Sequence, residues 1–502
     1  MISLPERQLF TKLETKIDAI CPKFYIDAGN IQVLHEPSEF YQTLKDLIKN
    51  AENRIFLSTL YIGKEENEFV NVIRQAMIAK PKLQVFILAD QLRSTREFPF
   101  SSSASLLTKL REEFPERCEI KLYHTPNLRG LKKRLVPKRF NEGWGLQHMK
   151  IYGADDSLII SGANLSRDYF TNRKDRYYLF HDKNLSEFFF HVHSTFAGLS
   201  FDCLPSKHGF LPTIEDSLAS QFRLEWNNDV PNPLTNSREF IKEASNRLQH
   251  LLCSSQDHTY QRDYKRPLTS SYGSSFTEDT QHENKAMDQN SYERTAIVYP
   301  LFQCMPVLTG QVQSTEDKVL DLLGNLIMNE KIEWTLTAGY FNVYPELRRQ
   351  LLKSKGTGEA IVASQQANGF YKSKGPSHMI PPAYQYIAEK FLIDATRMRK
   401  DIDVLQWQRP GHTYHAKGFW FTYPGRSTPF LTTIGSSNYT SRSRQLDLES
   451  TLVIMTQNQQ LQSSFQKEVQ LIRQYAKPMG SCNLEKVPVY VKALAALLRK
   501  KL

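Results

Sequence analysis

The sequence predicts an α/β protein made of two homologous domains, in which mixed sheets are flanked by helices and one site lies at the interface. Two observations support this fold class. Short β-branched and aromatic runs alternate with amphipathic helical runs along both halves of the chain. A histidine–lysine motif also occurs once in each half, followed at a matched distance by an asparagine and an acid. Duplication of a polar set indicates a duplicated domain whose halves meet.

In the first half, the segment SEFYQTLKDLIKNAEN places Phe40, Leu44 and Ile48 on one helical face, behind Ser38 as a possible cap. The runs RIFLSTLYIG and LQVFILAD are typical of short buried strands. The expected order continues with a helix near Ala104–Glu113, a strand CEIKLYH, two motif strands, a strand RYYLF and a helix near Leu185–Leu199.

The second half repeats this order. LTAGYFN, residues 336–342, occupies the place that LSTLYIG, residues 57–63, has before the first motif. The other expected elements are helix Glu316–Asn329, strand WTLTAGYF, helix Tyr344–Lys353, strand EAIVAS, helix Pro382–Thr396, strand DVLQW, the motif strands, STLVIM and a helix near Asn458–Tyr475. The predicted divisions are an N-terminal extension (1–23), a first domain (24–205), a helical and polar linker (206–295), a second domain (296–480) and a basic amphipathic C-terminal segment (481–502).

Within the linker, Ser254–Arg294 is rich in polar residues and contains no valine, isoleucine or tryptophan. Such a segment buries little apolar surface, which predicts a disordered or loosely packed insertion. A substrate lid is the alternative.

The duplicated motif contains the residues expected to carry chemistry. The first copy, HMKIYGADDSLIISGANLSRDYFTNRKD, supplies His148, Lys150, Asp155, Asn164 and Asp175. The second copy supplies His415, Lys417, Asn438 and Glu449. The asparagine and the acid are eleven residues apart in both copies. One H-x-K alone is often a chance surface pair, but two copies with the same partners indicate a shared site.

These residue types suit phosphoryl transfer. A neutral histidine can attack phosphorus while a second histidine protonates the leaving oxygen, and ordinary pKa values near 6.5 would allow both states at neutral pH. The lysines and asparagines can stabilise the oxygens of the transition state. Asp175 and Glu449 can each hold an imidazole in one tautomer.

The motif resembles that of the phospholipase D superfamily, H-x-K-x4-D followed by G-S-x-N. His148, Lys150 and Asp155 match the triplet, and Gly162 and Asn164 match a shortened tail. In the second copy Thr422 replaces the expected aspartate, which makes the first copy the safer position for the nucleophile. The fold implied is two phospholipase D-like domains with one active site at their interface.

The first half also resembles the eukaryotic phosphatidylglycerophosphate synthases, a family within that superfamily. The matching elements are Leu128–Leu131, Arg139–Glu142, Gly145–His148, Ser161–Ser166, Tyr169–Arg173 and Asp175–Tyr177, with HAKGFW and GSSNYTSRS in the second half. The resemblance implies phosphatidyl transfer from CDP-diacylglycerol to glycerol 3-phosphate, a step toward phosphatidylglycerol and cardiolipin. It also implies a location on the matrix face of the mitochondrial inner membrane.

In the mechanism that the resemblance implies, His148 attacks the lipid phosphate and releases CMP. His415 protonates the leaving group and then deprotonates the incoming hydroxyl. Lys150, Lys417, Asn164 and Asn438 stabilise the phosphoryl oxygens, and Asp175 and Glu449 orient the histidines across the interface. Asp155 belongs to the same motif, but we expect it to support the architecture. The chemistry does not require a metal ion or another cofactor.

Charge and cysteine content limit the partners and the compartment. The 502 residues carry a formal net charge of +11, with a pI near 9.1, which indicates an anionic partner. Six cysteines without C-x-x-C spacing favour a reducing compartment. No apolar run approaches the ~20 residues that cross a bilayer, so we expect peripheral membrane contact. Acids at Glu6, Glu14 and Asp18 are not typical of a mitochondrial transit peptide.

A basic stretch precedes the first motif and contains Arg129, Lys132, Lys133, Arg134, Lys138 and Arg139. It could bind the diphosphate of a nucleotide lipid or the acidic head groups of a membrane, and a solvated basic face is the alternative. Interleaved leucines favour a membrane edge and disfavour nucleic acid.

Two further segments are candidates for binding. The loop Ala89–Arg96 follows a predicted buried strand, and Arg93, Ser94, Thr95 and Arg96 could hold a nucleotide phosphate, although a purely structural loop is equally consistent. The C-terminal segment VPVYVKALAALLRKKL places Val491, Leu494, Ala495 and Leu498 at helical spacing. It predicts an interfacial helix, or a surface helix packed on the second domain.

Three rival functions use similar residues. A nuclease or another phosphodiesterase of the superfamily would use the same histidines, and the basic charge suits it. A phospholipase or a cardiolipin-type synthase would differ only in its acceptor. A non-catalytic membrane-binding protein would not need both H-x-K pairs. The oligomeric state is not indicated by the sequence.

Overall fold

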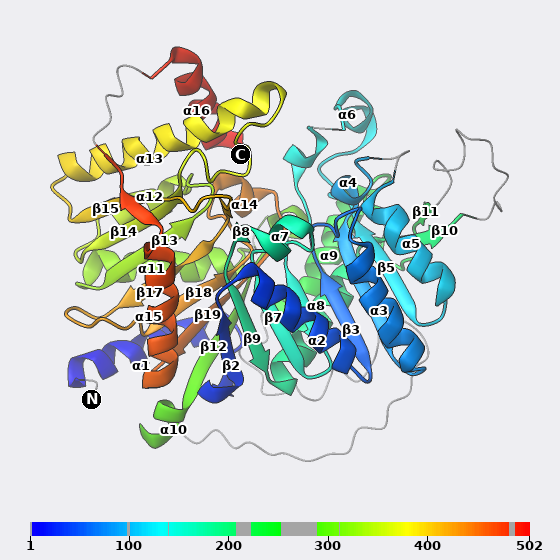
Figure 1. Cartoon of the computed structure of the whole chain (residues 1–502), viewed down its shortest axis with the longest axis horizontal. Coiled ribbons are helices and arrows are strands. Elements are labelled where there is room, and N and C mark those ends of the chain that lie inside the picture. Colours follow the sequence, from blue (N-terminus) through cyan, green and yellow to red (C-terminus); the bar gives the residue numbers. More distant parts are fainter. Residues whose placement is uncertain are drawn as a thin grey trace.

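The protein is described here from a computed structural model that covers residues 3–97, 101–138, 140–206, 222–252, 289–310, 312–480 and 487–501. Two nine-stranded sheets lie side by side and are flanked by helices (Figure 1). The predicted α/β class is therefore confirmed. Arg139 and most of the segment 254–294 lie outside the described residues.

The first sheet has the strand order β11-β10-β5-β4-β3-β6-β7-β9-β2. Its central strands β3, β4 and β5 are parallel, and their apolar runs are buried on both faces, as parallel strands require. The strands are β2 (Ile31–Leu34), β3 (Arg54–Ser58), β4 (Gln84–Asp90), β5 (Cys118–Tyr123), β6 (Ile151–Ala154), β7 (Ser157–Ser161), β9 (Tyr177–His181), β10 (Phe201–Pro205) and β11 (Phe222–Glu225).

The second sheet repeats this pattern in the order β1-β12-β19-β18-β17-β13-β14-β15-β20. Parallel β13, β14 and β15 are followed by antiparallel β17, β18 and β19, which correspond to β6, β7 and β9. The strands are β1 (Phe24–Asp27), β12 (Thr295–Gln303), β13 (Glu333–Ala338), β14 (Gly358–Ala363), β15 (Ile402–Trp407), β17 (Lys417–Thr422), β18 (Leu431–Gly435), β19 (Glu449–Thr456) and β20 (Ala476–Pro478).

Helices form three layers around the two sheets. The outer face of the first sheet is covered by α2 (Pro37–Asn50), α3 (Asn67–Ala79), α5 (Ser103–Glu113) and α7 (Arg167–Thr171). The outer face of the second sheet is covered by α1 (Leu4–Asp18), α11 (Thr315–Asn329), α12 (Pro345–Leu352), α13 (Ile380–Arg397) and α16 (Val489–Lys501). Between the sheets, α8 (Lys183–Ala197), α9 (Ser237–Leu252) and α15 (Gln459–Arg473) join both inner faces into one continuous core.

The N-terminal segment crosses from one half to the other. β1 pairs with β12 in the second sheet, although the next strand, β2, belongs to the first sheet. α1, which begins with a capping box between Ser3 and Glu6, buries Phe10, Leu13 and Ile17 in the core of the second sheet. The sheet boundary therefore does not coincide with the domain boundary that we predicted at residue 24.

The C-terminal helix α16 packs on the second half. Val491 and Ala495, two of the residues expected on an interfacial face, are buried in the same core as α13. This arrangement corresponds to the surface-helix alternative, because Val491 and Ala495 are already covered by protein.

A buried ion pair connects the two sheets. Arg176, immediately before β9, donates to both oxygens of Glu468 on α15, at 2.9 and 2.8 Å. The hydroxyl of Tyr178 donates to the same carboxylate, and the guanidinium lies 3.8 Å from the ring centroid of Trp420 on β17. A side chain at Gly418 (φ +140°) would meet an Arg176 nitrogen at 2.0 Å, so the close approach requires glycine.

Glu468→Gln is expected to destabilise the protein by about 3–5 kcal/mol, because it leaves the buried Arg176 cation without its counter-charge. Urea unfolding measures this free energy. The matched control is Glu113→Gln, which removes an exposed ion pair with Arg74 of 2.6 Å and is expected to cost less than about 1 kcal/mol. Equal losses in the two variants would contradict the structural role of the pair.

Candidate active site

The two histidines, the two lysines and their acids gather at one edge of the two sheets. His148 and Lys150 immediately precede β6, and Lys417 begins β17. Two short parallel pairings tie the halves together at this edge: β8 (Arg173–Lys174) with β16 (Thr413–Tyr414), and Gln147 with Leu448. The site is therefore built where the halves are directly hydrogen-bonded to each other.

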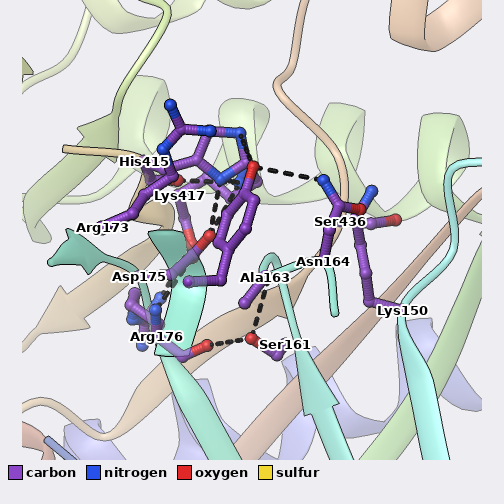
Figure 2. A network of polar contacts seen from close by, with 12 residues as sticks. Lys150, Ser161, Ala163, Asn164, Arg173, Asp175, Arg176, His415, Lys417 and Ser436 are labelled. Atoms are coloured by element: carbon purple, nitrogen blue, oxygen red, sulfur yellow. Dashed lines mark hydrogen bonds and ion pairs between the residues drawn. The ribbon is translucent and has the colours of Figure 1, made fainter. Parts of the chain in front are cut away.

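Each histidine takes its carboxylate from the other half. Nδ1 of His148 lies 2.9 Å from both oxygens of Glu449, and Nδ1 of His415 lies 2.6 Å from Oδ2 of Asp175 (Figure 2 shows the second pair). All four residues are buried. When Nδ1 donates to a carboxylate, Nε2 keeps its lone pair, which is the form that a nucleophile or a general base requires.

The backbone fixes these pairs. The amide of His148 donates to the carbonyl of Leu448, next to Glu449, at 2.9 Å. The amide of His415 donates to the carbonyl of Lys174, next to Asp175, at 2.8 Å. Each imidazole is thus placed by the strand that also carries its acid.

The two lysines lie beside the histidines, and both are buried. Lys150 donates to the carbonyl of His148 at 2.5 Å. Lys417 donates to the carbonyl of His415 at 2.8 Å and to Asp175 at 3.4 Å. In an extended chain, residues i and i+2 share one side, which explains the H-x-K spacing.

Asn164 points toward the second histidine. Its amide donates to the hydroxyl of Tyr169 at 3.2 Å, and this hydroxyl lies 3.4 Å from Nε2 of His415 (Figure 2). Oδ1 of Asn164 is buried and has no hydrogen-bond partner among the described residues. Asn438, its counterpart, is half-buried and follows Gly435 at the end of β18.

Sequence reasoning missed several residues that complete the site. Tyr169 faces His415, and Ser436 donates to Glu449. Ser436 belongs to the G-S-x-N tail, so its position was a usable signal. Tyr169 lies in the matching element Tyr169–Arg173, but no role in the site was expected for it.

Burial shifts the titration of the site. Desolvation, together with Lys150, places the pKa of His148 well below its ordinary value, and desolvation with Lys417 lowers the pKa of His415 to about 3. The expectation of ordinary histidine pKa values was therefore wrong. Burial also lowers the pKa of Lys150 to about 7 and raises that of Glu449 to about 7.

For Asp175, neighbouring charges outweigh the effect of burial on the pKa. Burial alone would raise the pKa of its carboxyl, but Lys417 and His415 hold this pKa below the ordinary value. The resting site thus contains two neutral imidazoles. Protonation of His415 is therefore disfavoured until a negative charge enters the site.

Asp155 is not among the residues that the structure brings together. It lies in the turn after β6, at φ +46°. Its carboxylate accepts the backbone amides of Glu52, Asn53 and Arg54 at 2.7, 3.0 and 2.9 Å. These contacts give it a structural position at the end of β6 away from Lys150.

The candidate nucleotide loop lies next to the site. Asp90 caps α4 (Gln91–Ser94), and its carboxylate also accepts the amide of Gln147, the neighbour of His148, at 3.0 Å. Arg93 lies 4.4 Å over the ring of Tyr61. Arg96 forms an ion pair with Glu142, and the hydroxyl of Thr95 donates to the carbonyl of Gln91. Oγ of Ser94 is buried and has no hydrogen-bond partner among the described residues.

The basic stretch forms α6 (Gly130–Leu135), which projects beyond the body of the molecule (Figure 1). Arg129, Lys132, Lys133, Arg134 and Lys138 are exposed, as are three apolar side chains, Leu131, Leu135 and Phe140. No helix within the described ranges is long and apolar enough to span a bilayer. The same ranges hold no group of three or more His, Cys, Asp or Glu arranged to bind a metal ion.

Comparison with known proteins gives relatives over the full length. The chain is 61% identical to "CDP-diacylglycerol--glycerol-3-phosphate 3-phosphatidyltransferase" of Schizosaccharomyces pombe, over 99% of both chains. It is 32% identical to the mitochondrial protein of that name from Gallus gallus, over 96% of this chain and 85% of the relative. Phosphatidylserine synthase of Haemophilus influenzae has the same fold, with a TM-score of 0.66 and 20% identity over 98% and 99% of the two chains. No protein-family model matches the chain.

Both site histidines are expected to remain neutral between pH 5 and 7.5, because burial holds their pKa values below this range. Nitrogen-15 NMR of histidine-labelled protein can detect the unprotonated Nε2. The single variants His148→Gln and His415→Gln assign the two signals, and urea-unfolded protein gives the reference near pH 6.5. An imidazole that gains a proton above pH 6 would contradict the buried site.

Proposed function

Because this chain belongs to the family of CDP-diacylglycerol–glycerol-3-phosphate 3-phosphatidyltransferases, we propose that His148 and His415 divide the two steps of the transfer between them. The enzyme makes phosphatidylglycerophosphate and CMP from CDP-diacylglycerol and glycerol 3-phosphate. The observation that carries the proposal is the crosswise pairing of each histidine with the acid of the other half.

In the first step, Nε2 of His148 forms a bond to the lipid phosphorus, and the bond from this phosphorus to the CMP oxygen breaks. His148 is favoured as the nucleophile because its Nε2 makes no hydrogen bond to the described residues, whereas Nε2 of His415 faces Tyr169. The incomplete motif at Thr422 points the same way. The product of this step is a phosphatidyl-histidine and CMP.

His415 supplies and recovers one proton. Its lowered pKa leaves it neutral in the resting site, so it takes a proton when the anionic donor binds and raises that pKa. It gives the proton to the leaving CMP oxygen. In the second step it removes the proton of the attacking hydroxyl of glycerol 3-phosphate, while the new O–P bond forms and the bond to His148 breaks.

The remaining site residues stabilise charge. Lys150 and Lys417 provide cationic donors for the phosphoryl oxygens in a site that excludes water, because the anionic substrate opposes the burial that lowers their pKa values. Asn164 and Asn438 provide amide donors. Asp175 and Glu449 orient the imidazoles and stabilise the protonated form.

The Ala89–Arg96 loop is our candidate for contact with the cytidine nucleotide. Its Asp90 is hydrogen-bonded to the residue before His148, so the loop lies directly against the segment that carries the nucleophile. The unpartnered hydroxyl of Ser94 is available to a ligand. Arg93 is the better candidate for a phosphate contact, because its ion pair with Glu97, at 3.5 Å, is looser than the pair of Arg96 with Glu142.

The enzyme is further proposed to work at an anionic membrane surface on the matrix face of the mitochondrial inner membrane. The location is supported by the mitochondrial names of the vertebrate relatives. The membrane contact is supported by α6, where Leu131 and Leu135 are 70% and 71% exposed among basic residues. α16 contributes less than expected, because Val491 and Ala495 are covered by protein.

His148→Ala and His415→Ala are each expected to reduce transfer by more than 1,000-fold without lowering the melting temperature by more than a few degrees, because each removes a reacting group. Product analysis with labelled CDP-diacylglycerol measures the transfer. Stopping the wild-type reaction with base should trap lipid label on the protein, since phosphohistidine survives base.

No label should appear on His148→Ala. Label on that variant, together with its loss from His415→Ala, would reverse the two roles. Asp155→Asn serves as the control, because Asp155 lies outside the site and should trap label normally when the variant is folded.

Vesicle co-sedimentation tests the membrane contact. Binding to anionic vesicles is expected to fall when Lys132, Lys133, Arg134 and Lys138 become Gln, because each basic residue at such a surface contributes about 1 kcal/mol. It should also fall with salt, since the Debye length drops from about 10 Å at 0.1 M to about 3 Å at 1 M. The control changes four exposed lysines elsewhere, at Lys49, Lys82, Lys331 and Lys353. Binding that survives both treatments would show that the apolar side chains dominate.

A further inference from the structure

Arg173 lies beside the second histidine, and the mechanism above does not use it. It forms β8 with Lys174 and pairs with Thr413, two residues before His415. Residues i and i+2 of a strand share a face, so Arg173 lies on the same side as Asp175, which holds His415. Figure 2 shows Arg173 next to this pair.

The guanidinium of Arg173 is largely buried without a close acid. Its side chain is only 15% exposed, and Nε donates to Oγ1 of Thr413 at 3.1 Å. Its single ion-pair partner in the described part of the chain is Asp168, 3.9 Å away and 66% exposed. The neighbouring groups are the ring of Tyr169, 4.9 Å below the guanidinium, and Tyr340. Burying a cation with so little compensation is costly unless a ligand supplies the anion.

The second half also has one basic and one acidic residue at the two positions equivalent to Arg173 and Asp168, but in the opposite order. Asp447 lies two residues before Glu449, as Arg173 lies two residues before Asp175. Arg442 lies four residues after Asn438, as Asp168 lies four residues after Asn164. In this half the acid, Asp447, is the buried partner, and it forms an ion pair of 3.2 Å with Arg442. Of these two pairs of described residues, the one on the His415 side therefore leaves a buried positive charge without a close acid.

The chemistry places a second anion on that side. In-line displacement brings the acceptor to the face of the phosphorus opposite His148, where His415 removes its proton. Glycerol 3-phosphate differs from glycerol by a phosphate that carries a charge of about −1.5 to −2 and does not react. Lys150 and Lys417 are engaged with the transferred phosphoryl group, so this phosphate needs another cation.

We propose that Arg173 binds the phosphate of glycerol 3-phosphate and selects this acceptor over uncharged alcohols, an inference that rests on the assignment of His415 to the acceptor side. The planar guanidinium suits this role because it can donate two parallel hydrogen bonds to one phosphate. Gly369 leaves room for it, since a Cβ there would lie 2.7 Å from an Arg173 nitrogen and 2.9 Å from the Tyr340 hydroxyl.

Steady-state kinetics with two acceptors test the proposal. The quantity measured is the ratio of kcat/KM for glycerol 3-phosphate to that for glycerol. Arg173→Gln is expected to lower this ratio about 10- to 100-fold, which is the range for losing a hydrogen-bonded charge. Arg173→Lys should give a smaller loss, because it keeps the charge without the planar fork.

Two further variants separate recognition from folding. Gly369→Ala keeps every charge and should lower the same ratio by displacing the guanidinium, so it decides the question if Arg173→Gln does not fold. Arg442→Gln is the matched control and should keep the wild-type ratio, because Arg442 is paired with Asp447. An unchanged ratio in Arg173→Gln or in folded Gly369→Ala, or an equal drop in Arg442→Gln, would overturn the proposal.

Base-stopped labelling without any acceptor tests the phosphatidyl-histidine step separately from the acceptor site at Arg173. Labelled Arg173→Gln protein together with a lowered ratio supports both the histidine roles and the acceptor site. Absence of label from the wild-type enzyme would refute the phosphatidyl-histidine step itself, whatever the acceptor ratio shows.

Discussion

The crosswise hydrogen bonds from the histidines to the carboxylates of the opposite halves are the constraint on which the site depends. Neither half alone holds a complete histidine–acid pair, because Asp175 serves His415 and Glu449 serves His148. The pairs form only when the sheets are docked, and docking also buries the lysines. Arg176 follows Asp175 directly in the chain, and its ion pair with Glu468 stabilises the same interface. The contacts that set the catalytic geometry therefore lie within the interface, beside the contacts that stabilise it.

The two halves share the same strands and motif spacing, but their site residues have different surroundings. The strands, the H-x-K spacing and the eleven residues from asparagine to acid are the same in both halves. The surroundings differ: a hydroxyl faces Nε2 of His415, and the buried member of the neighbouring ion pair is basic in one half and acidic in the other. This asymmetry lets one fold hold a nucleophile and a proton carrier at the same time.

The sequence predicted the parts of the site whose residue types are dictated by chemistry. The strands were recognisable from their apolar runs, and the histidines, lysines and acids from their repeated spacing. Tyr169 and Glu468 were not predicted as site residues, because neither belongs to the set that recurs in both halves, and their contacts with His415 and Arg176 exist only in the folded chain. The lowered histidine pKa values also escaped prediction, since desolvation depends on how tightly the two halves exclude water. Asp155 shows the reverse case, in which a motif residue binds backbone amides away from the reaction.

The crossing of β1 into the second sheet has a consequence for how the chain assembles. Residues 24–27 are synthesised well before their partner β12, which begins at residue 295. Until that strand is synthesised, α1 and β1 have an apolar face and an unpaired edge with no native partner, the condition under which nascent chains aggregate. Contacts of such long sequence separation also slow folding, because the loop must close before its contacts stabilise it. A cut in the connecting segment would for the same reason leave a first fragment that carries two elements of the other half.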